Sequence, residues 1–299
     1  MSSLDQLVDQ YLEYLKQEKK ASSLTIRNYT HYLNRFLNFL KKHFPTLVYL
    51  EAMNQNVIQR YKSYLIEFVD QKGNHLNPIT QGYHFIALRS FLRYLILKGF
   101  STLNLELIDV PHGKSMPLKF LDSREIEMLL RLPNNLRDKS IMELLLSTGL
   151  RVSDLVKLNK KNVDFTNREV VISASSGGYR TIFFSETTGY WLKKYLGGRN
   201  DNEIALFIRE AGKKDAPLRL TVRSIQRILE KYVKKAGIQI KATPSTFRHT
   251  FAINLMSSGE NIKTIQKLLG HKNISTTQIY THVTNPQLRE IHKRFHRIT

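Results

Sequence analysis

The side chains best suited to phosphate chemistry lie between residues 243 and 283, in TPSTFRHTFAINLMSSGENIKTIQKLLGHKNISTTQIYTHV. Arg248, His271 and Tyr280 stand there in a strongly patterned helical context. A guanidinium pairs well with phosphate oxygens, and a phenol can act as a covalent nucleophile when its neighbours activate it. Each residue taken alone is more often structural, because a tyrosine near a helix end usually packs and an arginine is usually solvated. The chemistry therefore depends on whether the chain brings the three together.

Helix signals indicate how Arg248 is positioned. Thr243 and Pro244 are typical of a helix start, with the threonine as the cap and the proline at the first helical position. Arg248 then falls within the first two turns. The next segment, 261–270, is amphipathic. Its apolar side holds Ile262, Ile265, Leu268 and Leu269, and its polar side holds Lys263 and Lys267.

Gly270 indicates how the chain turns toward the tyrosine. This glycine is expected to end the amphipathic helix in the left-handed conformation, and His271 follows at once. A second short helix, ISTTQIY, is expected to be capped by Asn273 or Ser275 and carries Tyr280. His271 and Tyr280 are nine residues apart, so a turn between two short helices can bring them close.

A second arginine lies in a similar setting about 100 residues earlier, in SIMELLLSTGLRVSDLVKL. The apolar run Ile141–Leu146 predicts a buried helix that Gly149 breaks, and Arg151 begins the next helix. Asp154, one turn further on, could orient the Arg151 guanidinium through a bidentate pair. The alternative is a structural arginine–aspartate pair within one helix.

Two of these phrases resemble the tyrosine recombinase (lambda-integrase) family, in particular the Xer recombinases. LLGHKNISTTQIYTHV is close to that family's signature, and STGLRVSDLVKL resembles its first arginine motif. The resemblance implies that Tyr280 is the nucleophile and that Arg151, Arg248 and His271 form the phosphate-binding pocket. It also implies a mainly α fold with a small antiparallel β-sheet. An N-terminal four-helix SAM-like DNA-binding domain would precede a C-terminal tyrosine-recombinase catalytic domain.

The same resemblance implies a site-specific recombinase that cleaves and rejoins double-stranded DNA through a 3′-phosphotyrosyl intermediate. Its biological role would be chromosome-dimer resolution or the integration and excision of a mobile element. The expected assembly is a homotetramer or heterotetramer on two DNA duplexes that carry a specific recombination site. Strand exchange would proceed through a Holliday junction, and neighbouring protomers would exchange their C-terminal helices. No cofactor is expected.

The sequence departs from the family at two expected catalytic positions. The lysine of the family's β-hairpin falls on Ser175, and no lysine lies between Lys161 and Lys193. The family's histidine, three residues before the second arginine, is replaced by Ser245. A neutral hydroxyl is a poor replacement for an ammonium acid. His249 is adjacent to Arg248, but about 100° away around the helix, and we do not expect it to substitute without a shift.

These two serines leave a second interpretation open, a recombinase-fold protein that binds DNA but has impaired catalysis. A type IB topoisomerase is a weaker third interpretation, because the enlarged clamp usual in that class is absent from the sequence.

There is no carboxylate or histidine cluster at metal-ligand spacing, so two-metal nuclease chemistry is not expected. There is also no Gly-x-x-x-x-Gly-Lys-Ser/Thr loop, which argues against ATP-driven work.

Charge points to a polyanionic partner. The 299 residues carry a formal net charge of +21, which favours nucleic acid because lysine and arginine release counterions from phosphates. Residues 1–110 hold 13 Lys or Arg against 9 Asp or Glu, so most of the excess lies in the part with the candidate chemistry. No apolar run is long enough for a membrane span. There is no cysteine and no visible secretory signal, which favours a cytoplasmic, nucleoid-associated protein.

The periodicity predicts two domains. Residues 1–107 hold four amphipathic helices, expected over 4–18, 24–43, 57–69 and 79–97. Residues 108–118 contain two prolines and a glycine and are expected to form a linker, before a catalytic domain over 119–299. Residues expected to contact DNA are Lys20, Arg27, Arg89, Arg93, Arg180 and Arg223, with His84 on the same polar face.

The catalytic domain is expected to include short strands as well as helices. NVDFTNREVVISAS and YRTIFFS read as strands, with Ser175–Gly178 as the hairpin turn. ALFI (205–208) reads as a further strand. The last segment, 281–299, predicts a short helix with one apolar stripe. Family resemblance implies that it docks into a neighbouring protomer, and the alternative is docking onto its own domain.

Overall fold

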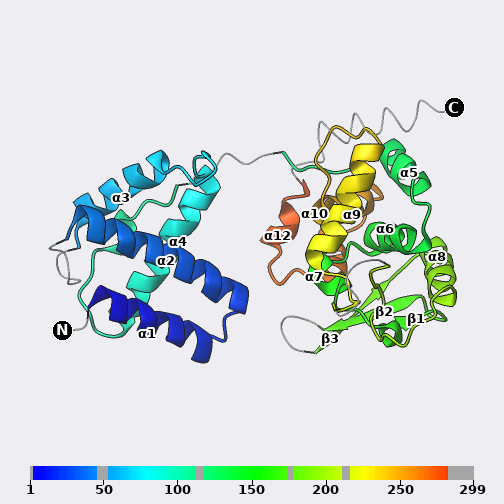
Figure 1. The fold of residues 1–299 in the computed structure, drawn as a ribbon, viewed down its shortest axis with the longest axis horizontal. Coiled ribbons are helices and arrows are strands. Elements are labelled where there is room, and N and C mark those ends of the chain that lie inside the picture. Colours follow the sequence, from blue (N-terminus) through cyan, green and yellow to red (C-terminus); the bar gives the residue numbers. More distant parts are fainter. Residues whose placement is uncertain (1–2, 46–52, 112–116, 174–177, 211–215, 282–299) are drawn as a thin grey trace. The chain divides into compact units, whose positions relative to one another are not determined.

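The computed structural model describes residues 3–45, 53–111, 117–173, 178–210 and 216–281 (Figure 1). The chain divides into two compact units, Met1–Met116 and Pro117–Thr299. Helices dominate both units, and the second also contains a small antiparallel sheet with the strand order β1-β2-β3. The expected fold class, mainly α with a small antiparallel sheet, is confirmed.

The first unit is a bundle of four long helices, as the apolar periodicity predicts. They are α1 (Leu4–Gln17), α2 (Ser23–His43), α3 (Gln55–Glu67) and α4 (Pro78–Leu97), followed by the short 3₁₀ helix η2 (Leu105–Leu107). Their apolar faces form one core, which includes Leu7, Phe36 and Leu88. Ile108, the first residue of the expected linker, is 1% exposed in the same core. The packing of this unit therefore extends at least to residue 108.

His84 was expected on a polar, DNA-facing surface, and this expectation is wrong. The side chain is buried, its Nδ1 lies 3.1 Å from the Tyr61 hydroxyl, and its ring centroid lies 4.5 Å from that of Tyr32. Burial, followed by the nearby Arg35 charge, lowers the pKa of His84 to about 3. The imidazole is thus a neutral core group rather than a phosphate contact.

The second unit holds eight α-helices and three strands within its described residues. The elements are α5 (Ser123–Arg131), α6 (Leu136–Thr148), α7 (Val152–Leu155), η3 (Lys160–Asn162), β1 (Val163–Asp164), β2 (Glu169–Ser173), β3 (Tyr179–Phe183), α8 (Glu186–Gly197), α9 (Val222–Lys235), α10 (Pro244–Ser257), α11 (Ile262–Leu269) and α12 (Ser275–Gln278). Val170 pairs with Ile182 in the sheet, and both side chains are buried. The strand expected at ALFI is wrong, because Ala205 and Ile208 form only isolated bridges.

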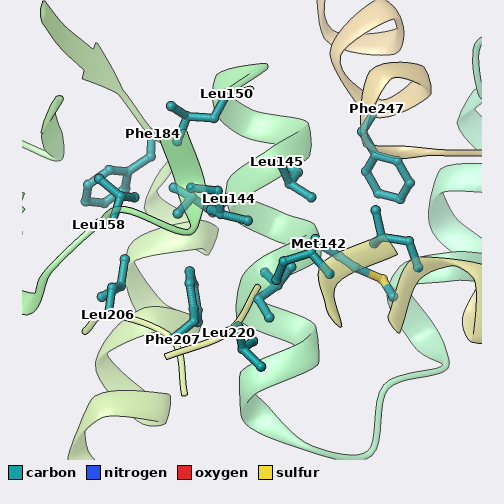
Figure 2. Packing of buried hydrophobic residues seen from close by; sticks show 14 of the residues in the cluster. Met142, Leu144, Leu145, Leu150, Leu158, Phe184, Leu206, Phe207, Leu220 and Phe247 are labelled. Carbon is teal, nitrogen blue, oxygen red and sulfur yellow. The ribbon is translucent and has the colours of Figure 1, made fainter. Parts of the chain in front are cut away.

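Helix α6 is the centre of this unit's core. It packs against α8 and α10, and its residues Ile141, Met142, Leu144 and Leu145 are almost completely buried. Figure 2 shows Phe247 of α10 on one side of α6 and Phe184, which follows β3, on the other. Because α6 is held from both sides, its C-terminal end is a fixed platform for the residues that follow it.

Local capping chemistry sets where the functional segments begin and end. Thr243 caps α10 and Pro244 follows at its start, as predicted. Gly149 and Gly270 end α6 and α11 in the left-handed conformation, with φ of 58° and 65°. The cap of α12 is Ile274, which makes no side-chain capping bond, so the expected cap at Asn273 or Ser275 is wrong.

Candidate active site

Arginine side chains from three elements meet at the C-terminal end of α11. The last carbonyls of an α-helix have no partners within the helix, and here three successive carbonyls accept guanidinium N–H groups. Arg180 Nη1 donates to Leu268 O at 3.2 Å, Arg248 Nη2 to Leu269 O at 2.7 Å, and Arg151 Nη2 to Gly270 O at 3.4 Å. The negative end of the helix dipole stabilises cations at this place. The end of α11 therefore gathers three positive charges that lie far apart in the sequence.

Arg248 is the most constrained of these arginines. It is 7% exposed, and its Nη1 donates a second hydrogen bond, of 2.7 Å, to the Gly149 carbonyl at the end of α6. Burial, and then the neighbouring Arg151 charge, lower the pKa of Arg248 to about 10. The side chain remains protonated at neutral pH. It ties the end of α6 to the end of α11.

Arg151 stands directly before α7, two residues after the left-handed Gly149. A Cβ at Gly149 would collide with the Phe251 ring, so close packing as well as the positive φ requires glycine there. The expected pair between Arg151 and Asp154 is wrong. Asp154 Oδ2 lies 4.0 Å from Arg180 Nη2 instead. The carboxylate thus holds the arginine of β3 rather than its own helical neighbour.

The charge balance of this cluster favours an anion. The three guanidinium groups repel one another. Among the described residues, Asp154 is the carboxylate whose negative charge attracts them. Burial lowers the pKa of the Arg180 guanidinium, and the Arg151 charge adds to this fall. The Asp154 charge acts in the opposite direction. Partly buried like charges are costly unless a counter-charge is present. The site is built to accept a negatively charged group such as a phosphate.

His271 lies beside the arginines and is 9% exposed. Its Nδ1 is 2.8 Å from Thr277 Oγ1, and its backbone carbonyl accepts a bond from Gln266. Burial and the charges of the three arginines lower its pKa to about 4, so the ring is neutral at physiological pH. When the Thr277 hydroxyl donates to Nδ1, Nε2 carries the proton and can donate to a phosphate oxygen.

Tyr280 completes the cluster from the turn that follows α12. The residue is 1% exposed and packs with Ala252, Ile253, Ile265 and Leu269. Its hydroxyl is not in apolar packing, because it lies 3.0 Å from His249 Nδ1. Burial raises the pKa of the phenol, while the Arg248 and Arg151 charges oppose that rise. The phenol is therefore protonated at rest and needs an acceptor before it can act as a nucleophile.

The structure brings together Arg151, Arg248, His271 and Tyr280, the four site residues for which the sequence matches the family motif. It adds Arg180, which was expected only as a general DNA contact. Ser245 is exposed on α10, one turn before His249. Ser175 and residues 282–299 of the expected C-terminal helix lie outside the described residues.

The sequence did not predict two contacts of this cluster, because His249 was considered and set aside and Thr277 was not considered. A buried tyrosine hydroxyl needs a hydrogen-bond partner, and this requirement could have pointed to a histidine on the adjoining helix. For Thr277 the only signal was a small polar residue within an otherwise amphipathic turn. Neither signal specifies a partner without the tertiary structure.

The other expected DNA contacts are surface residues. Lys20, Arg27 and Arg93 are exposed on the first unit and Arg89 is half-buried there, whereas Arg223 is exposed on α9.

In the described parts of the chain, no group of three or more His, Asp or Glu residues could hold a metal ion. None of the described helices combines the length and the apolar character that a membrane span requires.

Gly270 provides a direct test of this architecture. A Cβ at this position would overlap the Arg180 guanidinium, and the backbone φ of 65° disfavours any other residue. We expect Gly270→Ala to displace Arg180 and to lower the free energy of unfolding by about 1–3 kcal/mol. Chemical denaturation measures this loss. Gly259→Ala is the matched control, because Gly259 also has a positive φ, of 85°, with no atom within 4 Å of an added Cβ.

If both variants lose the same stability, the cost lies in the backbone conformation alone, and the close approach of Arg180 to Gly270 contributes nothing. A larger loss in Gly270→Ala, relieved by also changing Arg180 to alanine, supports the packing described here.

Comparison with known families finds two matching sequence patterns. Residues 119–286 match the phage integrase family, and residues 8–99 match the phage integrase N-terminal SAM-like domain. The first match covers more than half of the chain and includes every arginine and histidine of the cluster as well as Tyr280.

Curated relatives match along almost the whole chain. Tyrosine recombinase XerA of Pyrococcus horikoshii is 34% identical over 286 residues, which are 95% of this chain and 91% of XerA. Tyrosine recombinase XerC of Thermodesulfovibrio yellowstonii is 33% identical over 312 residues, covering 99% and 98% of the two chains.

Solved structures share the fold. A crystal structure of XerA recombinase matches with a TM-score of 0.53 at 27% identity and covers 97% of this chain and 98% of the other. XerH site-specific recombinase, bound to a palindromic difH substrate in a post-cleavage complex, matches with a TM-score of 0.72 at 20% identity. That match covers 97% of this chain and 85% of XerH.

Proposed function

Because the chain belongs to the phage integrase family, as a Xer-like tyrosine recombinase that cleaves and rejoins DNA at specific sites, we propose that Tyr280 is its nucleophile. The Tyr280 oxygen attacks a DNA phosphodiester, the 5′-oxygen leaves, and a 3′-phosphotyrosyl ester conserves the bond energy. A hydroxyl of another strand then attacks the ester and completes the exchange. One observation carries this proposal: Tyr280 lies in the same buried cluster as Leu269, whose carbonyl accepts the Arg248 guanidinium, and the next carbonyl, of Gly270, accepts Arg151.

The surrounding side chains have distinct roles in this proposal. Arg151 and Arg248 face the non-bridging oxygens and stabilise the charge that develops on them. Each guanidinium has five N–H donors, so the carbonyl contacts that hold Arg248 leave donors for phosphate. Neutral His271, oriented by Thr277, donates a hydrogen bond to a phosphate oxygen. Arg180 adds a third positive charge beside them.

The experiment must find the DNA site as well as the activity. A pool of duplexes with a randomised segment and scattered nicks is incubated with the full chain, and DNA that stays attached to protein after denaturation is recovered and sequenced. A nick beside the cleaved phosphate lets a short fragment diffuse away, which traps the covalent ester. We expect a common sequence among the recovered DNA. Sequence-selective binding without any denaturation-resistant adduct would contradict the proposed chemistry.

Ser175 and Ser245 favour a second candidate function, a recombinase-fold protein that binds DNA without cleaving it. Ser245 presents an exposed hydroxyl at the position where the resemblance implies a histidine. The same pool separates the two functions, because an impaired enzyme binds its site tightly and forms no adduct. In that case, Ser175→Lys combined with Ser245→His is expected to restore adduct formation.

We further propose a tetramer on two duplexes, homomeric or with a related recombinase, acting in the cytoplasm on a chromosomal or mobile-element site. Relatives solved with DNA and the concentration of positive charge in residues 111–299 support DNA as the partner. The domain limits 1–107 and 119–299, with the linker 108–118, stay a prediction. The two family patterns, over 8–99 and 119–286, are compatible with it.

Arg223, in the second unit, is expected to contact the DNA backbone. This contact can be tested separately from the chemistry. Loss of a phosphate contact weakens binding by a similar factor on every DNA sequence. We expect Arg223→Ala to reduce the slope of log affinity against log salt concentration by about 1. Fluorescence titration of a duplex at several salt concentrations measures this. Arg124, exposed on α5, supplies the matched control, and an equal change in Arg124→Ala would show that general charge rather than a contact is responsible.

A further inference from the structure

The proton of the Tyr280 hydroxyl has no assigned acceptor in the function proposed above. Formation of the bond between the phenol oxygen and phosphorus requires that this proton depart. The adjacent Arg248 and Arg151 cannot take it, because a guanidinium has no acceptor site. A neutral base within hydrogen-bond reach is needed.

His249 has the required geometry. Its Nδ1 lies 3.0 Å from the Tyr280 hydroxyl, and the two ring centroids are 5.6 Å apart. The ring is half-buried on α10, directly after Arg248. Because Arg248 is anchored through two backbone carbonyls, the helix turn that carries His249 is held in register with the phosphate-binding arginines.

The other candidate acceptors among the described residues are less suitable. His271 Nδ1 is engaged with Thr277 Oγ1. Ser245 carries a hydroxyl, which is a very weak base, and it is exposed on α10. Asp154 lies against Arg180. Among these described groups, only His249 forms a hydrogen bond with the phenol.

We propose that His249 is the catalytic base for DNA cleavage, an inference that rests on the function proposed above. The neutral Nδ1 takes the phenol proton while the Tyr280 oxygen bonds to phosphorus. The bond from phosphorus to the 5′-oxygen breaks, and that oxygen keeps the electron pair and takes a proton from water. When a strand hydroxyl later attacks the ester, it gives its proton to the hydroxide that the first step left in the solvent, and the Tyr280 oxygen leaves and recovers a proton from the His249 imidazolium. Protons and electrons therefore balance over the full cycle.

The electrostatic surroundings suit this role. Burial, and then the Arg248 charge, lower the pKa of His249 below its ordinary value of 6.5, so Nδ1 is unprotonated and can accept at pH 7. The groups facing the ring are Arg248, Tyr280 and His271. The imidazolium formed on proton transfer would be disfavoured beside Arg248 alone. A bound phosphate supplies the negative charge that offsets it.

Two substitutions separate a proton acceptor from a residue that only positions the phenol. His249→Asn keeps an amide near the Nδ1 position and can hold the hydroxyl, but it cannot take the proton. His249→Ala removes both functions. On a nicked duplex of the recovered site, we expect His249→Asn to slow single-turnover adduct formation by about 10²–10⁴-fold. Added imidazole should partly restore His249→Ala. DNA affinity and thermal unfolding are measured on both variants to show that each is folded.

The pH profile gives a second readout. Because the wild type requires neutral His249, its cleavage rate should fall as the pH drops through the pKa of this residue, which lies below 6.5. In His249→Asn that acidic limb should disappear. The rate should instead rise about tenfold per pH unit, because hydroxide must then remove the proton.

Wild-type adduct formation together with a His249→Asn rate within about threefold of wild type, and an unchanged acidic limb, would overturn the proposal. A faster His249→Ala would also overturn it, because His249 would then restrain the phenol. Absence of any adduct from the wild type is a different result. It would contradict the proposed function itself, and the proposed role of His249 would then fall as well.

Discussion

Tyr280→Phe should abolish the covalent protein–DNA adduct while the protein continues to bind its site. Phenylalanine fills the same space in the apolar cluster around α10 and α11, so the fold has no reason to change beyond the loss of one hydrogen bond to His249. Loss of a nucleophile removes the chemical step itself, and we expect the adduct to fall by at least ~10⁴-fold. Denaturing electrophoresis of protein incubated with the recovered nicked duplex measures the adduct.

Tyr232→Phe is the matched control for this experiment. Its hydroxyl donates a 3.0 Å bond to Asp138 and is likewise buried, within the main core of the same unit. Both changes should lower the free energy of unfolding by about 1 kcal/mol, while only Tyr280→Phe should lose the adduct. An adduct that persists in Tyr280→Phe would show that another side chain carries the DNA.

Local sequence signals predicted the frame of the site well. The cap at Thr243, the break of the helix at Gly149 and the left-handed end at Gly270 are confirmed. Each is decided within a few residues by backbone conformation and nearby hydrogen bonds. The bundle helices of the first unit are also confirmed to within two residues at either end, because apolar periodicity is likewise local.

Contacts between distant segments could not be predicted in the same way. Asp154 was assigned to Arg151 because the two are close in sequence, whereas the fold brings Arg180 of β3 to the carboxylate. His84 lies on a helix whose apolar residues surround it almost completely, so periodicity could not separate its core position from a surface one. The end of α11 is the clearest case. Its carbonyls require partners, but nothing local says that arginines from 88 and 119 residues away supply two of them.

Replacing Arg248 or Arg151 by lysine should slow cleavage by about 10³–10⁵-fold, the range found for arginines that stabilise phosphoryl transfer. Lysine keeps the positive charge but presents one compact donor group instead of a planar fork. A lysine at 248 cannot bridge the Gly149 and Leu269 carbonyls and also reach a phosphate. Single-turnover cleavage of the recovered duplex gives the rates, and Arg124→Lys is the surface control.

The free energy of unfolding should distinguish the Arg248→Lys and Arg151→Lys variants. Arg248 is buried and holds two carbonyls at 2.7 Å, whereas Arg151 holds one carbonyl at 3.4 Å. Arg248→Lys should therefore also lower the free energy of unfolding by about 1–3 kcal/mol, because a buried carbonyl loses its donor, and Arg151→Lys should lower it by much less.

The double variant decides whether both arginines act on one phosphate. Groups that stabilise the same transition state are not additive. If Arg151 and Arg248 bind one phosphodiester, the second arginine-to-lysine change should slow cleavage far less in a protein that already carries the first change than it does in the wild type. Fully additive losses would mean that they act at separate places, and the convergence at the end of α11 would then be structural only.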